Sequence, residues 1–75
     1  MNELTEKVLS VATTYLGPAA KIFVKLQVQS HMHNIDLDTL KKENLQELAK
    51  WLKIASSSII DKSKAEELAS KIAKL

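Results

Sequence analysis

The chain has 75 residues, no cysteine, and a net charge of +2 from eleven lysines and nine acidic residues. This length allows one domain with a small hydrophobic core, and we expect that single domain to span residues 1–75. The absence of cysteine excludes disulfides, thiolate metal sites and cysteine nucleophiles. All eleven basic residues are lysine; because arginine is the side chain best suited to guanine edges and phosphates, sequence-specific nucleic-acid recognition is disfavoured.

No stretch of the sequence approaches the roughly 20 apolar residues of a membrane-spanning helix. The most apolar run, residues 17–28, is interrupted by Lys21, Lys25 and Gln27. The first seven residues carry two glutamates and one lysine, unlike the basic start of a signal peptide. We therefore expect a soluble, cytoplasmic protein.

The first predicted helix runs from about Glu3 to Leu16, because apolar residues recur there at spacings of three and four, and Asn2 is its expected N-cap. It ends at Gly17 and Pro18, the only glycine and the only proline of the chain. Glycine closes a helix cheaply at positive φ, and proline is favoured in the first turn of the next helix. The pair therefore predicts a sharp corner.

The second predicted helix, from Pro18 to about residue 31 or 32, is apolar on two faces. One face carries Ala19, Ile22, Phe23 and Leu26, and the other carries Ala20, Val24 and Val28. Such a helix needs neighbours on both sides. Either it is the central helix of the fold, which is the simpler explanation, or its second face binds another chain.

Turn-forming residues interrupt the helical pattern over residues 31–38, and we expect Asp38 to cap a single short turn through Leu40. A third helix is predicted from about residue 43 to residue 59 or 60, and a fourth from residue 62 to the C-terminus, with Asp61 as its N-cap. Close approach of another helix is the favoured explanation for the serines at 56–58. The residues that these two helices are expected to bury are Leu45, Leu48, Ala49, Leu52, Ala55, Ile59, Ala65, Leu68, Ala69 and Ile72. The predicted fold is all-α, a compact bundle of four main helices with a short turn near Asp38.

The one local pattern that resembles a metal site is His31-Met32-His33, followed by Asp36 and Asp38. Two imidazoles and a carboxylate suit zinc, nickel or copper. Two surface histidines at a helix end are the more ordinary explanation, since the helix dipole favours histidine there. We predict no metal site and no cofactor.

Catalysis needs a nucleophile beside a base, paired inward carboxylates or a glycine-rich phosphate loop, and the sequence contains none of these. The expectation is a non-catalytic protein with no small-molecule substrate. Two classes remain: a protein-interaction or oligomerisation module, which we favour, and a small helix-turn-helix-like nucleic-acid-binding domain. The partner is another protein or a second copy in a homodimer. The candidate contact residues are Ala20, Val24, Val28, Trp51 and Ile54.

Two stretches, Tyr15-Leu16-Gly17-Pro18-Ala19-Ala20 and Leu45-Gln46-Glu47-Leu48-Ala49-Lys50-Trp51-Leu52, give the chain a resemblance to known proteins. The first contains a Leu-Gly-Pro-x-Ala core and the second a Leu-x-x-Leu-Ala-x-Trp pattern. They resemble small helical modules found as terminal appendages of bacterial and archaeal signalling and regulatory proteins. The resemblance implies an accessory or docking part of a regulatory system, and it assigns no catalytic residue.

Overall fold

The computed structural model describes residues 2–75, and the regular elements of this part are all helical, which confirms the predicted class. They are the α-helices α1 (Glu3–Leu16), α2 (Ala20–His31), α3 (Leu45–Ser56) and α4 (Lys62–Ala73), and the 3₁₀ turns η1 (Gly17–Ala19), η2 (Leu37–Thr39) and η3 (Lys42–Asn44). Because η1 joins α1 directly to α2 and η3 leads directly into α3, the helical segments number three, of 29, 15 and 12 residues, with η2 as a separate turn. The prediction of four main helices matches the structure only if the first segment is counted as two helices, α1 and α2, divided at Gly17.

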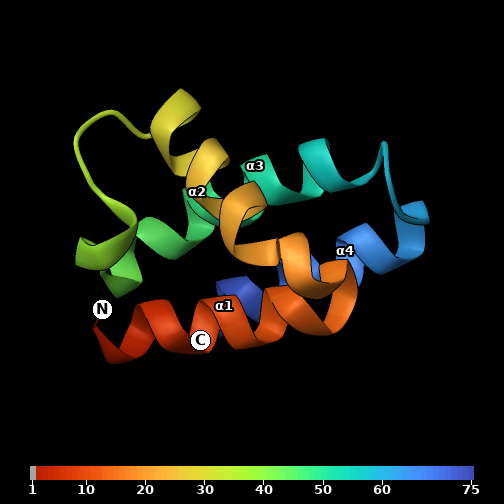
Figure 1. The fold of residues 1–75 in the computed structure, drawn as a ribbon, viewed down its shortest axis with the longest axis horizontal. Coiled ribbons are helices and arrows are strands. Elements are labelled where there is room, and N and C mark those ends of the chain that lie inside the picture. The colour runs from red at the N-terminus through yellow and green to blue at the C-terminus, as the bar shows by residue number, and fades with distance from the viewer. Residues whose placement is uncertain (1) are drawn as a thin grey trace.

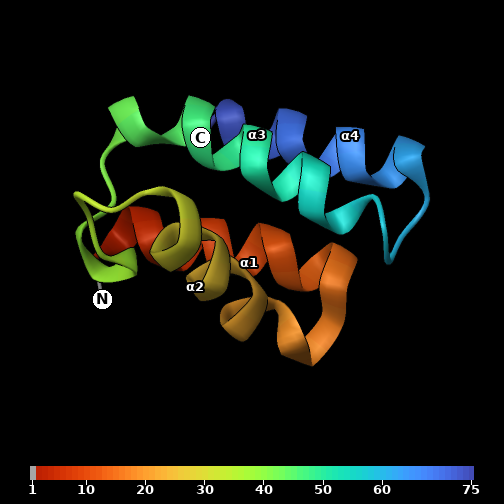
Figure 2. The same ribbon diagram turned by 90° about the horizontal axis from the view of Figure 1, so that it is seen from above.

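Two helical hairpins lie one on the other (Figure 1). Figure 2 shows α1 and α2 in one layer and α3 and α4 in the other, with the chain reversing direction within each pair. Packing follows a ring, because α1 contacts α2, α2 contacts α3, α3 contacts α4, and α4 contacts α1. The resulting globule measures 29 × 21 × 21 Å. None of the helices in residues 2–75 has the length and apolar character needed to cross a membrane.

The start of α1 is tied to the segment that carries η2. The Asn2 side chain accepts a hydrogen bond from the Thr5 N–H at 2.7 Å, which confirms the predicted N-cap. Its amide nitrogen also donates to the carbonyls of Asp38, at 3.0 Å, and Leu40, at 3.1 Å. The buried Thr5 hydroxyl donates to the Leu37 carbonyl. Side chains at the beginning of the chain therefore satisfy backbone groups in its middle.

The corner at Gly17 and Pro18 is confirmed. Gly17 has a φ of +71°, the only positive φ among the described residues, and its N–H bonds to the Thr13 carbonyl. A β-carbon at Gly17 would meet no atom within 4 Å, so glycine is favoured there by backbone conformation and not by lack of space. Pro18 falls inside η1, and α2 begins two residues later than predicted, at Ala20.

The short turn near Asp38 exists, but its N-cap is Asp36. The Asp36 carbonyl accepts from the Thr39 N–H at 3.0 Å, and the Asp36 N–H donates to the Thr39 hydroxyl at 3.1 Å. The cap prediction for Asp38 is therefore wrong by two residues. Threonine at position 39 closes the turn on Asp36 through its hydroxyl, and this local bond decides the boundary.

The third helix ends earlier than predicted, at Ser56. The hydroxyls of Ser57 and Ser58 donate to the carbonyls of Ile54 and Ala55, both at 2.8 Å, and so replace continued helical hydrogen bonds. As a result Ile59, expected in the core, is 61% exposed. The Ser56 side chain is fully buried, and its hydroxyl has no hydrogen-bond partner among the described residues.

The hydrophobic core lies between the two layers and takes side chains from all four α-helices. In α4 the predicted inward residues are the buried ones, whereas the Asp61 side chain makes no capping hydrogen bond. In α3 four of the predicted residues are buried, and Ala55 is only partly covered. The fully buried large apolar side chains are Leu48, Leu52, Leu68, Ile72, Val8, Val24 and Val28.

Candidate protein-interaction surface

Three of the five predicted contact residues belong to the core. Ala20 and Val24 are 0% exposed and Val28 is 1% exposed, because this face of α2 lies against α1 and α3. The opposite face, which carries Ile22 and Leu26, is the open one, at 67% and 51% exposure. In this conformation Ala20, Val24 and Val28 have no surface open to a partner. The expectation that α2 has neighbours on both faces holds for this face, whereas Ile22 and Leu26 on the other face are exposed.

Trp51 is half-buried and links α3 to the end of α2. Its ring stacks on the His31 imidazole with centroids 3.8 Å apart and planes 7° apart. The indole N–H donates to the Glu47 carboxylate at 3.3 Å, and the Lys50 ammonium lies 4.6 Å from the ring centroid. Trp51 is therefore a half-buried contact between two helices.

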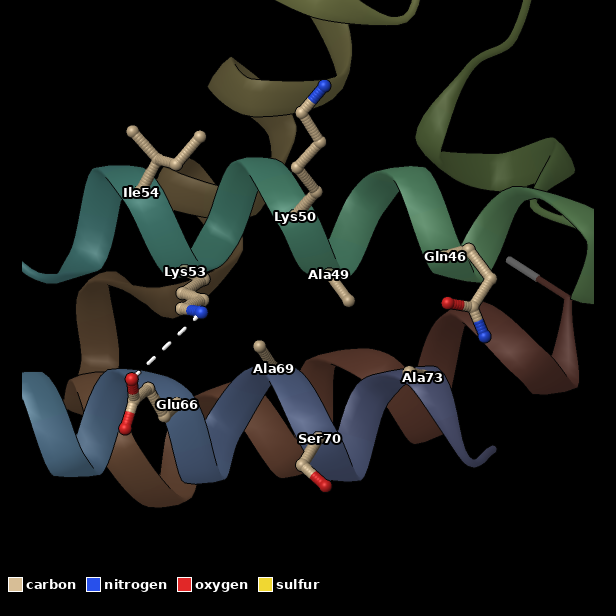
Figure 3. A pocket seen from close by; sticks show the side chains of 9 residues that line it. All are labelled: Gln46, Ala49, Lys50, Lys53, Ile54, Glu66, Ala69, Ser70 and Ala73. Carbon is tan, nitrogen blue, oxygen red and sulfur yellow. Dashed lines mark ion pairs between the residues drawn. The ribbon is translucent and has the colours of Figure 1, made fainter.

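Ile54, the fifth predicted residue, is 57% exposed on the outer side of α3. It lines a groove of about 550 Å³ between α3 and α4, which we call the α3–α4 groove. In Figure 3 Ala49 and Ala69 face each other across the middle of this groove. The ion pair between Lys53 and Glu66, at 4.0 Å, bridges the two helices toward one end. The groove is lined by Gln46, Ala49, Lys50, Lys53, Ile54, Glu66, Ala69, Ser70 and Ala73.

Short side chains make the groove. Ala49 and Ala69, 5% and 8% exposed, were predicted only as core residues, and both are at the margin of the core where α3 meets α4. An alanine at such a position covers the core without filling the space above it. The pairing of the two alanines across the helices depends on how α3 and α4 pack, so the spacing of apolar residues within each helix could not reveal it.

Basic side chains dominate the charge around the groove. A second hollow of about 360 Å³ continues past Ile54 and is lined also by Lys62 and Ala65. Lys50, Lys53, Lys62 and Glu66 are the charged residues that line the two hollows, and the Lys50 ammonium lies over the Trp51 ring. Glu66 pairs with Lys53, at half exposure for both side chains, so Lys62 is the lysine of this lining that has neither an ion pair nor an aromatic contact among the described residues.

The open face of α2 is a second apolar surface of the described residues. Ile22 and Leu26 are one turn apart on it. A neighbouring hollow brings Lys21 and Lys25 together with Asp36 and Asp38, so positive and negative groups are balanced there. This face therefore has exposed apolar area but no charge that selects a partner.

The two histidines at the end of α2 do not gather with further possible metal ligands in the described part of the chain. His31 is engaged with Trp51, and no three His, Asp or Glu side chains of residues 2–75 come together as a metal-binding group. The pKa of the exposed Lys71 is raised above its usual value, first by a hydrogen bond with the Tyr15 side chain and then by the charge of Tyr15. This direction is opposite to the lowered pKa that a lysine needs to act as a general base at neutral pH.

No protein-family model, curated protein or solved structure matches this chain.

Proposed function

We propose that this chain is a small non-catalytic protein-interaction module that binds its partner across the α3–α4 groove. The observation that carries the proposal is Ile54, a large apolar side chain that is 57% exposed at the edge of a groove lined by alanines. An exposed apolar residue beside a concave surface is typical of a contact site between proteins. In line with the resemblance of the sequence, the module acts as a cytoplasmic accessory part of a signalling or regulatory protein.

The shape of the groove supports a helical partner segment. Ala49, Ala69 and Ala73 have no side chain beyond the β-carbon, so the apolar face of another helix can approach both α3 and α4 closely. Ile54, whose side chain extends from α3 away from α4 in Figure 3, then supplies apolar contact along the outer edge. In this arrangement α1 and α2, separated by the corner at Gly17, form the layer that supports α3 and α4 from behind.

The alternative, a helix-turn-helix-like nucleic-acid-binding domain, has less support. After the corner at Gly17, the outward positions of α2 include Ile22 and Leu26, which have no hydrogen-bonding groups for base edges. The chain also lacks arginine. Apolar side chains of a partner protein can pack on this surface, whereas the base edges and phosphates of a nucleic acid need hydrogen-bonding or charged partners.

Site-specific photo-crosslinking in cells of the native host tests the proposal. A photoreactive amino acid is placed at position 54, and in a matched control at position 22, which also holds an exposed isoleucine but on α2. We expect a discrete protein adduct from position 54 and none of that mass from position 22. An adduct at twice the mass of the chain identifies a homodimer. If position 54 gives no adduct, or both positions give the same set, the groove is not the contact site and the proposal fails.

A further inference from the structure

We propose that the stack of His31 on Trp51 is a pH-sensitive clasp between the two layers of the fold, which tightens when the His31 imidazole takes up a proton. His31 is the last residue of α2, in one layer, and Trp51 belongs to α3, in the other (Figure 2). This inference goes beyond the function proposed above, because the stack joins α3 to α2, whereas the groove lies between α3 and α4.

The geometry of the stack suits a cation. The two ring centroids lie 3.8 Å apart and the ring planes are 7° from parallel, so the imidazole covers the face of the indole. The face of an aromatic ring carries the negative part of its quadrupole and attracts positive charge. A protonated imidazole therefore keeps the ring contact of the neutral stack and adds an electrostatic attraction that the neutral ring lacks.

The position of His31 at the end of α2 acts in the same direction. The last carbonyl groups of an α-helix give its C-terminus a partial negative charge, which stabilises a protonated histidine there. The His31 imidazole forms no ion pair and no hydrogen bond with any of residues 2–75, so protonation breaks no existing polar contact. The residue is exposed, so protons reach it directly from bulk water.

The charged neighbours of His31 come from α3 and from the loop that follows α2. The Glu47 carboxylate accepts from the Trp51 indole at 3.3 Å, and Glu47 lines a hollow of about 210 Å³ together with His31 and His33. The negative charge of Glu47 favours the protonated imidazole. The Lys50 ammonium, 4.6 Å from the Trp51 ring centroid, and a protonated His33 oppose it.

The other segments that pack on α2 do not add to this balance. Among residues 2–75, no charged side chain of α1 or η2 lines the hollow beside His31. Asp36 and Asp38 line a different hollow, beside Lys21 and Lys25. The imidazole touches the indole directly, whereas the opposing charges of Lys50 and His33 are on exposed residues and are screened by water and salt. We therefore expect the ring contact, the helix end and Glu47 to outweigh them.

The sign of the pH dependence follows from this balance. The folded chain holds the proton on His31 more tightly than the unfolded chain does, so uptake of the proton stabilises the fold. The stabilisation is complete at a pH below the range in which histidine ordinarily titrates, and it is lost as the pH rises through that range. At higher pH the neutral imidazole fastens the end of α2 to α3 less firmly.

Urea unfolding of the full chain at about pH 5.5 and about pH 8, followed by circular dichroism, tests the clasp. His31→Gln removes the titrating group and keeps a planar polar side chain. His33→Gln is the matched control, because His33 is also exposed and lies two residues away. Between the two pH values we expect the unfolding equilibrium constant of the unaltered chain to rise by at least about threefold more than that of His31→Gln, and His33→Gln to follow the unaltered chain. The same pH dependence in His31→Gln as in the unaltered chain, or its loss in His33→Gln alone, overturns the inference.

The emission of Trp51 gives a second measurement, on the folded chain without urea. Trp51 is the only tryptophan, so its emission reports on the stack. We expect the emission intensity to change in one titration between about pH 5 and about pH 8 in the unaltered chain and in His33→Gln, and to stay constant in His31→Gln. Constant emission in the unaltered chain, or the same titration in His31→Gln, contradicts the clasp.

Two neutralising variants test the charges beside the stack. Glu47→Gln removes the carboxylate that favours the protonated imidazole, so we expect the pH dependence of unfolding to become smaller. Lys50→Gln removes the opposing ammonium, so we expect the pH dependence to become larger. A change of the opposite sign in either variant overturns the inference, because proton uptake at His31 would then not be governed by these neighbours.

Discussion

Alanine substitutions at Val24 and Ile54 should lower the free energy of unfolding by different amounts, because Val24 lies in the core and Ile54 on the surface. Val24 is 0% exposed, and Val24→Ala removes two carbon atoms from the core. Each buried carbon contributes about 0.8 kcal/mol, so the transfer cost is about 1.6 kcal/mol. The cavity left behind adds up to about 1 kcal/mol, which brings the expected loss in free energy of unfolding to about 2 kcal/mol.

Ile54→Ala removes three carbon atoms from a side chain that is already 57% exposed, and it leaves no enclosed cavity. Alanine also favours the helix more than isoleucine does, so we expect a loss below about 1 kcal/mol. In a domain of this size the difference appears as a drop of roughly 8–16 °C in Tm for Val24→Ala and a much smaller change for Ile54→Ala.

Thermal and urea unfolding followed by circular dichroism measure both variants. Val24→Glu is the stronger version of the same test and should leave the chain unfolded, because an unpaired buried charge costs several kcal/mol. A Tm for Ile54→Ala that falls as far as that of Val24→Ala would refute the assignment of Ile54 to an open surface. A Tm for Val24→Ala close to that of the unaltered chain would refute the assignment of Val24 to the core.

Three further substitutions test local features. Gly17→Ala should cost about 1 kcal/mol of stability, because alanine is strained at a φ of +71°, and an unchanged urea midpoint would contradict this. Asn2→Ala removes the N-cap and the bonds to the Asp38 and Leu40 carbonyls, so we expect a loss of about 1–2 kcal/mol with faster amide hydrogen exchange over residues 37–40; unchanged exchange there would show that the tie is not maintained in solution. Ser56→Ala should leave the midpoint unchanged or raise it, because the buried hydroxyl has no partner, whereas a loss above about 1 kcal/mol would reveal an unseen bond.

Features encoded by neighbouring residues could be predicted from the sequence. The Asn2 cap, the Gly17 corner and the buried side of α4 each depend on a spacing or residue type within one segment. The end of α3 was predicted too late, since the hydroxyls of Ser57 and Ser58 compete with the helical hydrogen bonds and the apolar spacing does not show that competition.

The surface depends on packing between segments, and the sequence left it open. Val24 and Ile22 are both β-branched apolar residues, so composition alone could not decide which of them faces the core. Ile54 was named as a contact candidate and was not among the residues expected to be buried, and its exposure agrees with this. The groove beside it arises only when Ala49 and Ala69 meet across two helices, which the pattern within either helix cannot show.

The pairing of the helices has a consequence for how the chain folds. Contacts within α1–α2 and within α3–α4 join segments that are close in sequence, so each hairpin can form with little loss of loop entropy. Docking of α4 on α1 and the bonds from Asn2 to Asp38 and Leu40 instead join distant segments. We expect substitutions at the corner to slow folding, whereas loss of the Asn2 bonds should mainly speed unfolding.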